Sequence, residues 1–197
     1  MANEYCTLFE LKRQFGVEPD DESRDAELNR ARASASRSID STTGRRFWLD
    51  PAPVARVFTP AGRIVHDDDG ELFLVNDIGS TEGLIVETGG GASWSAVTEY
   101  ETSPDNALAD GRPITGLRRV LSTWGTATTR LRVTAKFGWP AVPEDVHEAA
   151  LILASRLYKR RDSPEGIIGS AEWGVRNLSR RDPDVWNLIE PYIIPGF

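Results

Sequence analysis

Side chains that could carry out catalysis are scarce in this sequence. It holds two histidines, His66 and His147, and a single cysteine, Cys6. A nucleophilic triad needs a histidine beside a serine or cysteine, and no serine stands in the Gly-x-Ser-x-Gly pattern that presents such a nucleophile. His147 lies between Glu144 and Glu148, where we expect an ordinary surface histidine. We therefore expect no enzyme and no catalytic residues, although two carboxylates that meet only after folding would leave no such pattern.

The sequence also lacks a recognisable metal or cofactor site. One cysteine rules out an intramolecular disulfide and any zinc site that takes two cysteines from one chain. The segment His66–Glu71 resembles a calcium loop, but aligning Gly70 with the invariant EF-hand glycine places Val65 and Asn76 at the first and last ligand positions. Gly89–Gly91 is not followed by a helix or by Lys-Ser, as a phosphate loop would be. We expect both segments to be turns, with no metal and no cofactor.

The charge of the chain argues against tight nucleic-acid binding. Its 197 residues carry 23 basic and 30 acidic side chains, which gives a formal net charge of −7. Acidic residues outnumber basic ones in residues 1–44, 45–142 and 143–197 alike. Proteins that grip nucleic acid carry clustered lysine and arginine, because neutralising phosphates supplies most of the affinity. Tight DNA binding is therefore disfavoured, whereas a position close to DNA is not.

Length and hydropathy indicate a chain that folds in water. At 40% hydrophobic composition it can bury one sizeable core without metals or disulfides. No stretch approaches the roughly 18 apolar residues of a membrane span, and the N-terminus has no basic segment followed by an apolar run. We expect a protein that is made in the cytoplasm, is not exported and has no membrane partner.

The first part of the chain, residues 1–44, has a helical pattern. Thr7 and Glu10 fit a capping box that begins a short helix, which ends at Gly16. A longer helix follows an acidic stretch and ends at Gly44. Its apolar residues recur at spacings of three and four and predict one buried face, formed by Leu28, Ala31, Ala35 and Ile39.

A helical pattern returns in residues 143–190. Pro143 and Glu144 suit the first turn of a helix, and Lys159 and Arg160 suit the last. Apolar residues cover most of this helix, so it must be buried from two sides. The second side is either the sheet or a neighbouring subunit. A further short helix is expected near residues 182–190, with Val185, Trp186 and Ile189 on it.

The middle of the chain is rich in β-forming residues. Short runs separated by Gly, Pro, Asn and Asp predict strands at 55–58, 72–75, 84–88, 97–101, 118–121 and 131–137. In the last run the apolar residues Leu131, Val133, Ala135 and Phe137 alternate with polar ones, as in a half-buried strand. No helical pattern lies between the strands, which predicts an antiparallel sheet.

Together these patterns predict an α+β fold in a single domain, residues 1–197. A helical part, 1–44 and 143–190, is expected to form a small bundle. The strand-rich antiparallel region, 45–142, is inserted into it.

Residues 191–197 form an apolar C-terminal tail. Chain ends are usually polar and frayed unless something holds them. Burying the large apolar residues of this tail contributes about 2 kcal/mol each before ordering costs; they are Tyr192, Ile193, Ile194 and Phe197. Either the chain's own core or a partner protein is expected to cover them.

Four groups of residues carry a resemblance to a known family. They are Tyr5, Cys6, Thr7, Leu8, Leu11 and Lys12; then Ser38, Ile39, Asp40, Gly44, Arg45, Arg46 and Phe47; then Phe137, Gly138, Trp139, Pro140, Val142, Pro143, Asp145, Val146 and Ala149; and finally Arg156, Leu157, Lys159, Arg160, Arg161, Ser163, Pro164, Glu165 and Gly166. In these residues the chain resembles the head-to-tail connector proteins of tailed phages, also called adaptor or head completion proteins. The motifs are packing and turn signatures at both helical ends.

The resemblance implies a virion structural protein of the neck, at the head–tail junction. Such connectors assemble as a ring, expected to match the twelvefold portal protein. The ring extends the DNA channel and binds downstream neck and tail proteins. We expect seven residues to face the portal or a neighbouring subunit: Arg160, Arg161, Trp186, Tyr192, Ile193, Ile194 and Phe197.

Two alternatives stay open at this point. A tail-side stopper or terminator ring would assemble on tail tubes in preference to heads. A carbohydrate or small-molecule-binding β module would instead place tryptophans, notably Trp94 and Trp124, in an open cleft.

Overall fold

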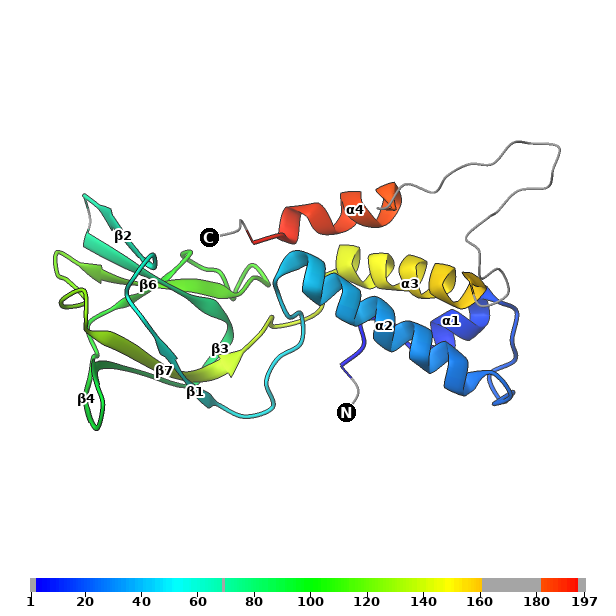
Figure 1. Ribbon diagram of the computed structural model, residues 1–197, viewed down its shortest axis with the longest axis horizontal. Coiled ribbons are helices and arrows are strands. Elements are labelled where there is room, and N and C mark those ends of the chain that lie inside the picture. The colour runs from blue at the N-terminus through cyan, green and yellow to red at the C-terminus, as the bar shows by residue number, and fades with distance from the viewer. Residues whose placement is uncertain (1–2, 69, 161–181, 195–197) are drawn as a thin grey trace. The chain divides into compact units, whose positions relative to one another are not determined.

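The computed structural model describes residues 3–68, 70–160 and 182–194 (Figure 1). Two compact units make up the fold. The helical unit takes residues 1–45 and 142–195, and the β unit takes residues 46–141. Helices and antiparallel strands are thus segregated along the chain, which confirms the α+β class.

The helices α1 (Leu8–Gln14) and α2 (Asp25–Thr43) follow the predicted pattern. The Thr7 hydroxyl accepts from the backbone N–H of Glu10 at 3.2 Å, and the Glu10 carboxylate accepts from the N–H of Thr7 at 2.8 Å, which completes the capping box. α2 ends at Gly44, whose φ of 68° is one that glycine adopts without strain. The predicted face of α2 is buried at Leu28, Ala31, Ala35 and Ile39.

The helix α3 (Glu144–Lys159) is covered from more than one side. α2 and α4 (Pro183–Ile189) both pack against it, and α1 touches it as well. Arg156 of α3 pairs with Asp182, the N-cap of α4, and lies 2.8 Å from Asp184. The second side of α3 is therefore α4, where the sequence suggested the sheet or a neighbouring subunit. Its buried residues are Val146, Ala149, Ala150, Ala154, Ser155 and Tyr158.

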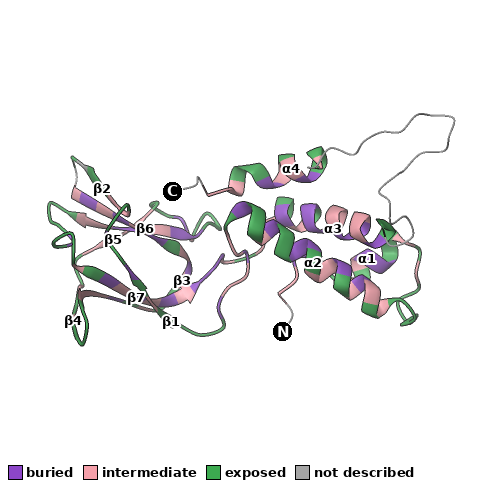
Figure 2. Ribbon diagram, viewed as in Figure 1, coloured by how far each residue is buried: buried purple, intermediate pink, exposed green. Residues whose placement is uncertain are grey.

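One antiparallel sheet forms the β unit and is organised around a long strand, β3 (Gly70–Gly90). The first half of β3 pairs with β2 (Ile64–Asp67) and β6 (Ile114–Val120), and its second half pairs with β4 (Ser93–Ala96) and β7 (Arg130–Phe137). β1 (Val54–Phe58) lies beside β7, and β5 (Glu101–Ser103) lies beside β6. The inner faces of these strands share one core (Figure 2).

Strand β7 confirms the predicted alternation. Leu131, Val133, Ala135 and Phe137 are each at most 1% exposed, while the residues between them reach the surface. The period of two therefore identified both the strand and its buried face.

The boundaries of three predicted strands are wrong. The runs at 72–75 and 84–88 are parts of the single strand β3, which continues through Gly79 with irregular register. A Cβ at Gly79 would lie 2.9 Å from the carbonyl oxygen of Gly138, so this glycine marks a close backbone approach and not a turn. In the run at 97–101 only Glu101 lies in a strand, β5, whereas Val97 and Tyr100 pack against the core outside any strand.

Candidate interaction surfaces

A groove lies between α2, α3 and α4 in the helical unit. Its lining residues are Ser38, Ile39, Ser41, Thr42, Leu153, Asp182, Val185, Trp186, Ile189 and Ile193. Apolar side chains from α3 and α4 thus face hydroxyl groups of α2. The one carboxylate in the lining, Asp182, is paired with Arg156. This groove suits an apolar side chain from another protein and offers no pair of groups for acid–base chemistry.

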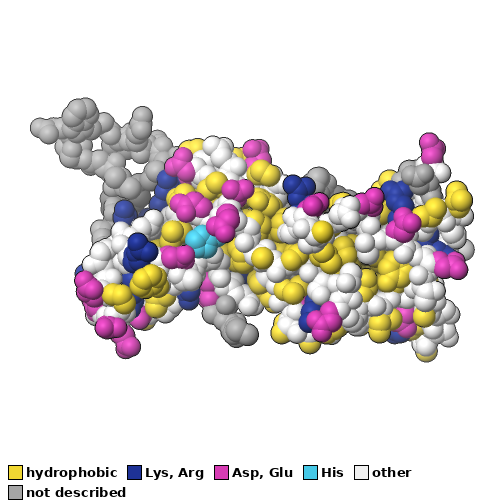
Figure 3. All heavy atoms as spheres, turned by 180° about the vertical axis from the view of Figure 1, so that it is seen from behind, with side chains coloured by type: hydrophobic (Ala, Val, Ile, Leu, Met, Phe, Trp, Pro, Cys, Tyr) yellow, Lys and Arg dark blue, Asp and Glu magenta, His cyan; other side chains and the backbone are white. Residues whose placement is uncertain are grey.

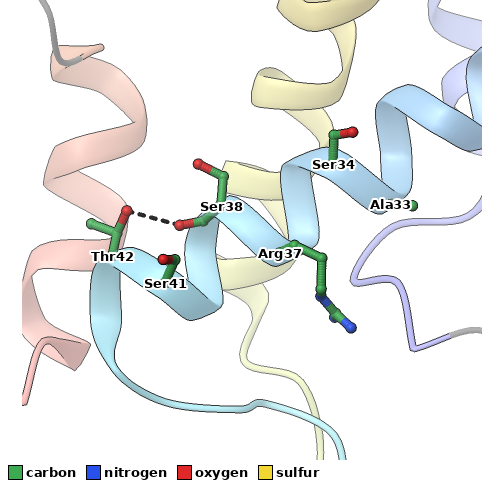
Figure 4. A pocket seen from close by; sticks show the side chains of 6 residues that line it. All are labelled: Ala33, Ser34, Arg37, Ser38, Ser41 and Thr42. Carbon is green, nitrogen blue, oxygen red and sulfur yellow. Dashed lines mark hydrogen bonds between the residues drawn. The ribbon is translucent and has the colours of Figure 1, made fainter.

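The adjoining surface of α2 is a shallow depression lined by small residues. Figure 4 shows its six side chains, Ala33, Ser34, Arg37, Ser38, Ser41 and Thr42. The Thr42 hydroxyl donates to the carbonyl oxygen of Ser38 at 2.8 Å, so it is turned back onto the helix. Arg37 Nε forms an ion pair with the Asp40 carboxylate at 3.0 Å, and the Arg37 guanidinium lies 5.8 Å from the centre of the Tyr5 ring. Short side chains leave the backbone of α2 open to close approach by another chain.

The residues after α4 are held to the end of α2 by their backbone. The N–H of Ile194 donates to the carbonyl oxygen of Thr43 at 2.9 Å. Arg45 Nε donates to the carbonyl oxygen of Tyr192 at 2.7 Å, and the Tyr192 hydroxyl donates to Asp145 at 3.2 Å. Tyr192, Ile193 and Ile194 nevertheless remain only half-buried. This segment is fixed in place while part of its apolar surface stays accessible.

The predicted interface residues do not all meet in one place. Trp186 and Ile193 line the same groove. Arg160 follows the end of α3 and is exposed, and it does not line that groove. Arg161 and Phe197 lie outside the described residues.

His147 has a different carboxylate partner from the ones its sequence neighbours suggested. Its Nε2 lies 3.1 Å from Glu10 of α1. The hydrogen bond from the Thr7 hydroxyl, with a smaller contribution from His147, lowers the pKa of Glu10 to about 2. Figure 3 shows further carboxylates gathered around a histidine on this side of the helical unit. The pair links α1 to α3 and has the character of a structural contact.

The tryptophans of the β unit do not share a cleft. Trp124 is 2% exposed, and its indole N–H donates to the carbonyl oxygen of Glu71 at 3.1 Å. Trp94 is half-buried on β4, with the Arg132 guanidinium 4.5 Å from its ring centre. The burial of Trp124 contradicts the open aromatic cleft that a carbohydrate-binding module would need.

Sequence reasoning missed a buried charge cluster in the β unit. Asp50 lies 2.9 Å from Arg46 and 3.6 Å from Arg56. Arg56 also stacks over the Phe137 ring at 4.0 Å, and burial lowers the pKa of its guanidinium. No periodicity links these positions, because the contacts depend on how β1 meets β7. The cluster holds β1 against β7.

Reactive and metal-binding groups do not gather in the parts of the chain that the structure describes. Within residues 3–68, 70–160 and 182–194, no three His, Cys, Asp or Glu side chains are placed to hold a metal ion. Burial raises the pKa of the Cys6 thiol to about 11, which makes it unreactive at neutral pH. None of the described helices combines the length and apolarity needed to span a bilayer.

The comparison with solved structures finds chains from gene transfer agent (GTA) particles. A chain from the neck of an empty GTA particle, computed with C6 symmetry, matches with a TM-score of 0.57 and 18% identity, over 96% of this chain and 89% of that chain. A chain from the virion of a native gene transfer agent (GTA) particle has a TM-score of 0.49 and 20% identity, over 92% and 84%. A chain from the neck of a native GTA particle, computed with C12 symmetry, has a TM-score of 0.44 and 19% identity, over 91% of this chain and 90% of that chain.

The first of these matches confirms the expected resemblance at the level of the fold. It spans the helical unit and the inserted β unit together, since it covers nearly all of both chains. No protein-family model matches the sequence, and no curated protein sequence is significantly similar to it.

Proposed function

We propose that this chain is a structural protein of a phage-like virion that works in the neck, where it joins head to tail. The observation that carries the proposal is the fold shared with a particle-neck chain over 96% of this chain and 89% of that one. Fold alone does not imply function. The connector-like motifs at both helical ends support the same conclusion independently, because they are local sequence features. An enzymatic role forms no part of this proposal.

In this proposal the helices form a small bundle that builds the body of a ring on the portal. A ring closes when one surface of each copy binds a different surface of the next. The groove between α2, α3 and α4 adjoins the small-residue depression on α2, with Ser38, Ser41 and Thr42 common to both. Together they form one continuous face with an apolar lining and room for close approach, which we propose as one of the two surfaces of the subunit contact. The expected ring is twelvefold, as the portal is.

The charge of the chain suits a channel wall. DNA carries about one negative charge per 1.7 Å of its axis, so a basic bore would hold it through counterion release. With a net charge of −7, this chain would let the duplex slide through the ring. Downstream neck and tail proteins would bind the end of the ring that faces away from the portal.

The C-terminal segment is proposed to dock into the portal. Tyr192, Ile193 and Ile194 keep accessible apolar surface although their backbone is anchored to α2. A weak contact of this size gains strength when a ring repeats it many times. Phe197 would add one more apolar anchor, and Arg160 and Arg161 would face the portal or the next subunit.

Co-sedimentation with portal-bearing heads tests this role. We expect the full-length protein to bind and the variant Phe197→Ala to bind more weakly, because it lacks one apolar anchor in every copy. Phe9→Ala is the matched control, since Phe9 is a 51% exposed phenylalanine on α1 outside the proposed contact. Wild-type binding by Phe197→Ala would refute the docking of the tail. Preferential assembly on tail tubes would favour the stopper alternative.

A charge-reversal experiment tests the two arginines. The double variant Arg160→Glu/Arg161→Glu should impair joining of heads to tails. Arg24→Glu/Arg30→Glu reverses two exposed arginines elsewhere and should have little effect. Normal joining by the first pair would remove these residues from the interface.

A further inference from the structure

We propose that the β unit carries both halves of a second contact between neighbouring copies of this chain, an inference that rests on the proposed ring. One half is an apolar tip formed by Val65, Leu72, Val120 and Leu121, which we call the tip patch. The other half is the outer surface of β1, β7 and the second half of β3, which we call the strand face. In the assembled ring the tip patch of one copy lies on the strand face of the next.

The tip patch is unusually apolar for the surface of a small sheet. Val65 is 45% exposed, Val120 is 46% exposed and Leu121 is 87% exposed. β2 and β6 both pair with the first half of β3, with Val65 opposite Leu72 and Val120 opposite Gly70. Directly opposed residues in antiparallel strands point to the same side of a sheet. Val65, Leu72 and Val120 therefore lie on one side of the sheet, and the exposed Leu121 follows Val120 directly in the chain.

Leu121 gives this patch its strongest indication of a partner. It has a φ of 50°, a left-handed conformation that costs a leucine energy, and its side chain gains almost no burial in return. The adjoining turn is closely packed, since a Cβ on Gly70 would lie 2.1 Å from the carbonyl oxygen of Arg119. The backbone that leads into Leu121 therefore lies close to Gly70 of β3.

The strand face is the second apolar surface of the same unit. Val57 on β1 is 51% exposed and Ile85 on β3 is 52% exposed. Their register partners on β7 are Arg132 and Thr134, which places all four on the outer side of the sheet. Trp94 extends this surface on β4, where Arg132 stacks on its ring.

The charges around the two surfaces are complementary, which identifies a second copy as the partner. On the strand face, Arg132 pairs with Glu87 and Lys136 pairs with Glu82, each at 2.5 Å. Arg130 is exposed on the same side and forms no ion pair with another described residue, so the strand face carries one positive charge that these pairs do not balance.

The turn beside the tip patch is negative. Asp68 lies in this turn and is exposed. Opposite charges beside two apolar surfaces favour one register of docking over others. Because the two surfaces differ, the contact is head-to-tail and propagates around a ring. Each surface is small, so the contact is weak alone and gains strength from repetition.

Disulfide trapping in solution tests the contact directly. The double variant Val57→Cys/Leu121→Cys, oxidised at high protein concentration, should form a ladder of covalent dimers, trimers and larger species on a non-reducing gel. The native thiol of Cys6 is 3% exposed and does not interfere. The matched control Val57→Cys/Ala109→Cys moves one cysteine to another exposed position of the β unit and should stay monomeric on the gel.

The outcomes separate this contact from the proposed function. Rings that form by sedimentation but give no ladder would refute the contact and leave the neck role standing. Absence of both rings and ladder would contradict both proposals. The single variants Val57→Cys and Leu121→Cys are tested alongside. Dimers from either of them, with no ladder from the double variant, would show a symmetric contact and refute the head-to-tail arrangement.

A charge swap provides a second measurement that does not depend on disulfide geometry. Arg130→Glu should slow ladder formation by about two- to fivefold, the range expected for an exposed ion pair. Adding Asp68→Arg to it should restore the rate, because the opposite charges are exchanged. If the second substitution slows trapping further, the two charges do not face each other.

Discussion

Replacing Asp50 with asparagine would measure how strongly buried charge stabilises the β unit. Asp50 is 8% exposed and lies 2.9 Å from Arg46 and 3.6 Å from Arg56. Without the carboxylate charge, two guanidinium groups would share a site where burial already disfavours the charged form of Arg56. Removing one partner of a fully buried ion pair costs about 3–5 kcal/mol. Because the arginine side chains are 28% and 35% exposed, water compensates part of this loss, and we expect about 2 kcal/mol.

Urea unfolding is the assay, followed by near-ultraviolet circular dichroism and fitted for the transition of the β unit. The matched control is Glu82→Gln, which removes the same charge from a pair with Lys136 at 2.5 Å. The Glu82 side chain is 76% exposed, so its loss should change the free energy of unfolding by less than about 0.5 kcal/mol. If Asp50→Asn destabilises no more than Glu82→Gln, the reasoning from burial is wrong.

Four further predictions concern local structure. Thr7→Ala should lower the free energy of unfolding by about 1 kcal/mol at pH 7, because it removes the cap of α1. The Glu10 carboxylate should contribute fully to the free energy of unfolding above about pH 4.5, and this contribution should disappear as the pH falls through its folded pKa of about 2. It is measured as the difference in free energy of unfolding between the wild type and Glu10→Gln. A difference that stays constant with pH in acid-unfolding curves would contradict this. The thiol of Cys6 should react with a thiol reagent at pH 8 only after denaturant is added, and equal rates would show that it is not buried. Gly70→Ala should destabilise the β unit by roughly 2 kcal/mol in thermal melts, whereas Gly90→Ala, with open space around it, should not.

Helix ends and helix faces could be predicted from the sequence because they depend on local interactions. The Thr7 capping box and the Gly44 terminus are made by residues a few positions apart. The buried face of α2 follows from spacing alone. The alternation in β7 identified its buried side for the same reason.

Strand continuity could not be predicted, because it depends on residues distant in the chain. Glycine is common in turns, yet Gly79 lies within β3, where the backbone near Gly138 passes close to it. Likewise, Val97 and Tyr100 are residue types that are common in strands, but here they pack against the core outside any strand. Whether such a segment forms a strand depends on which other strand it pairs with, and a single sequence does not identify that partner.

The candidate surfaces were only partly accessible to sequence reasoning. The sequence shows that Trp186 and Ile193 are apolar. That they line one groove together with residues of α2 depends on how α4 packs on α3. The pair between His147 and Glu10 joins positions on two different helices. The exposed apolar surfaces of the β unit depended on strand register, which places Val57 and Ile85 on the same side.

Direct imaging of the protein with purified portal tests the central claim. Negative-stain electron microscopy and sedimentation of the mixture would measure the symmetry and mass of any complex. The neck role predicts closed rings stacked on the portal, expected to be twelvefold, and co-sedimentation of the two proteins. A protein that stays monomeric and unbound at saturating portal concentration would contradict it.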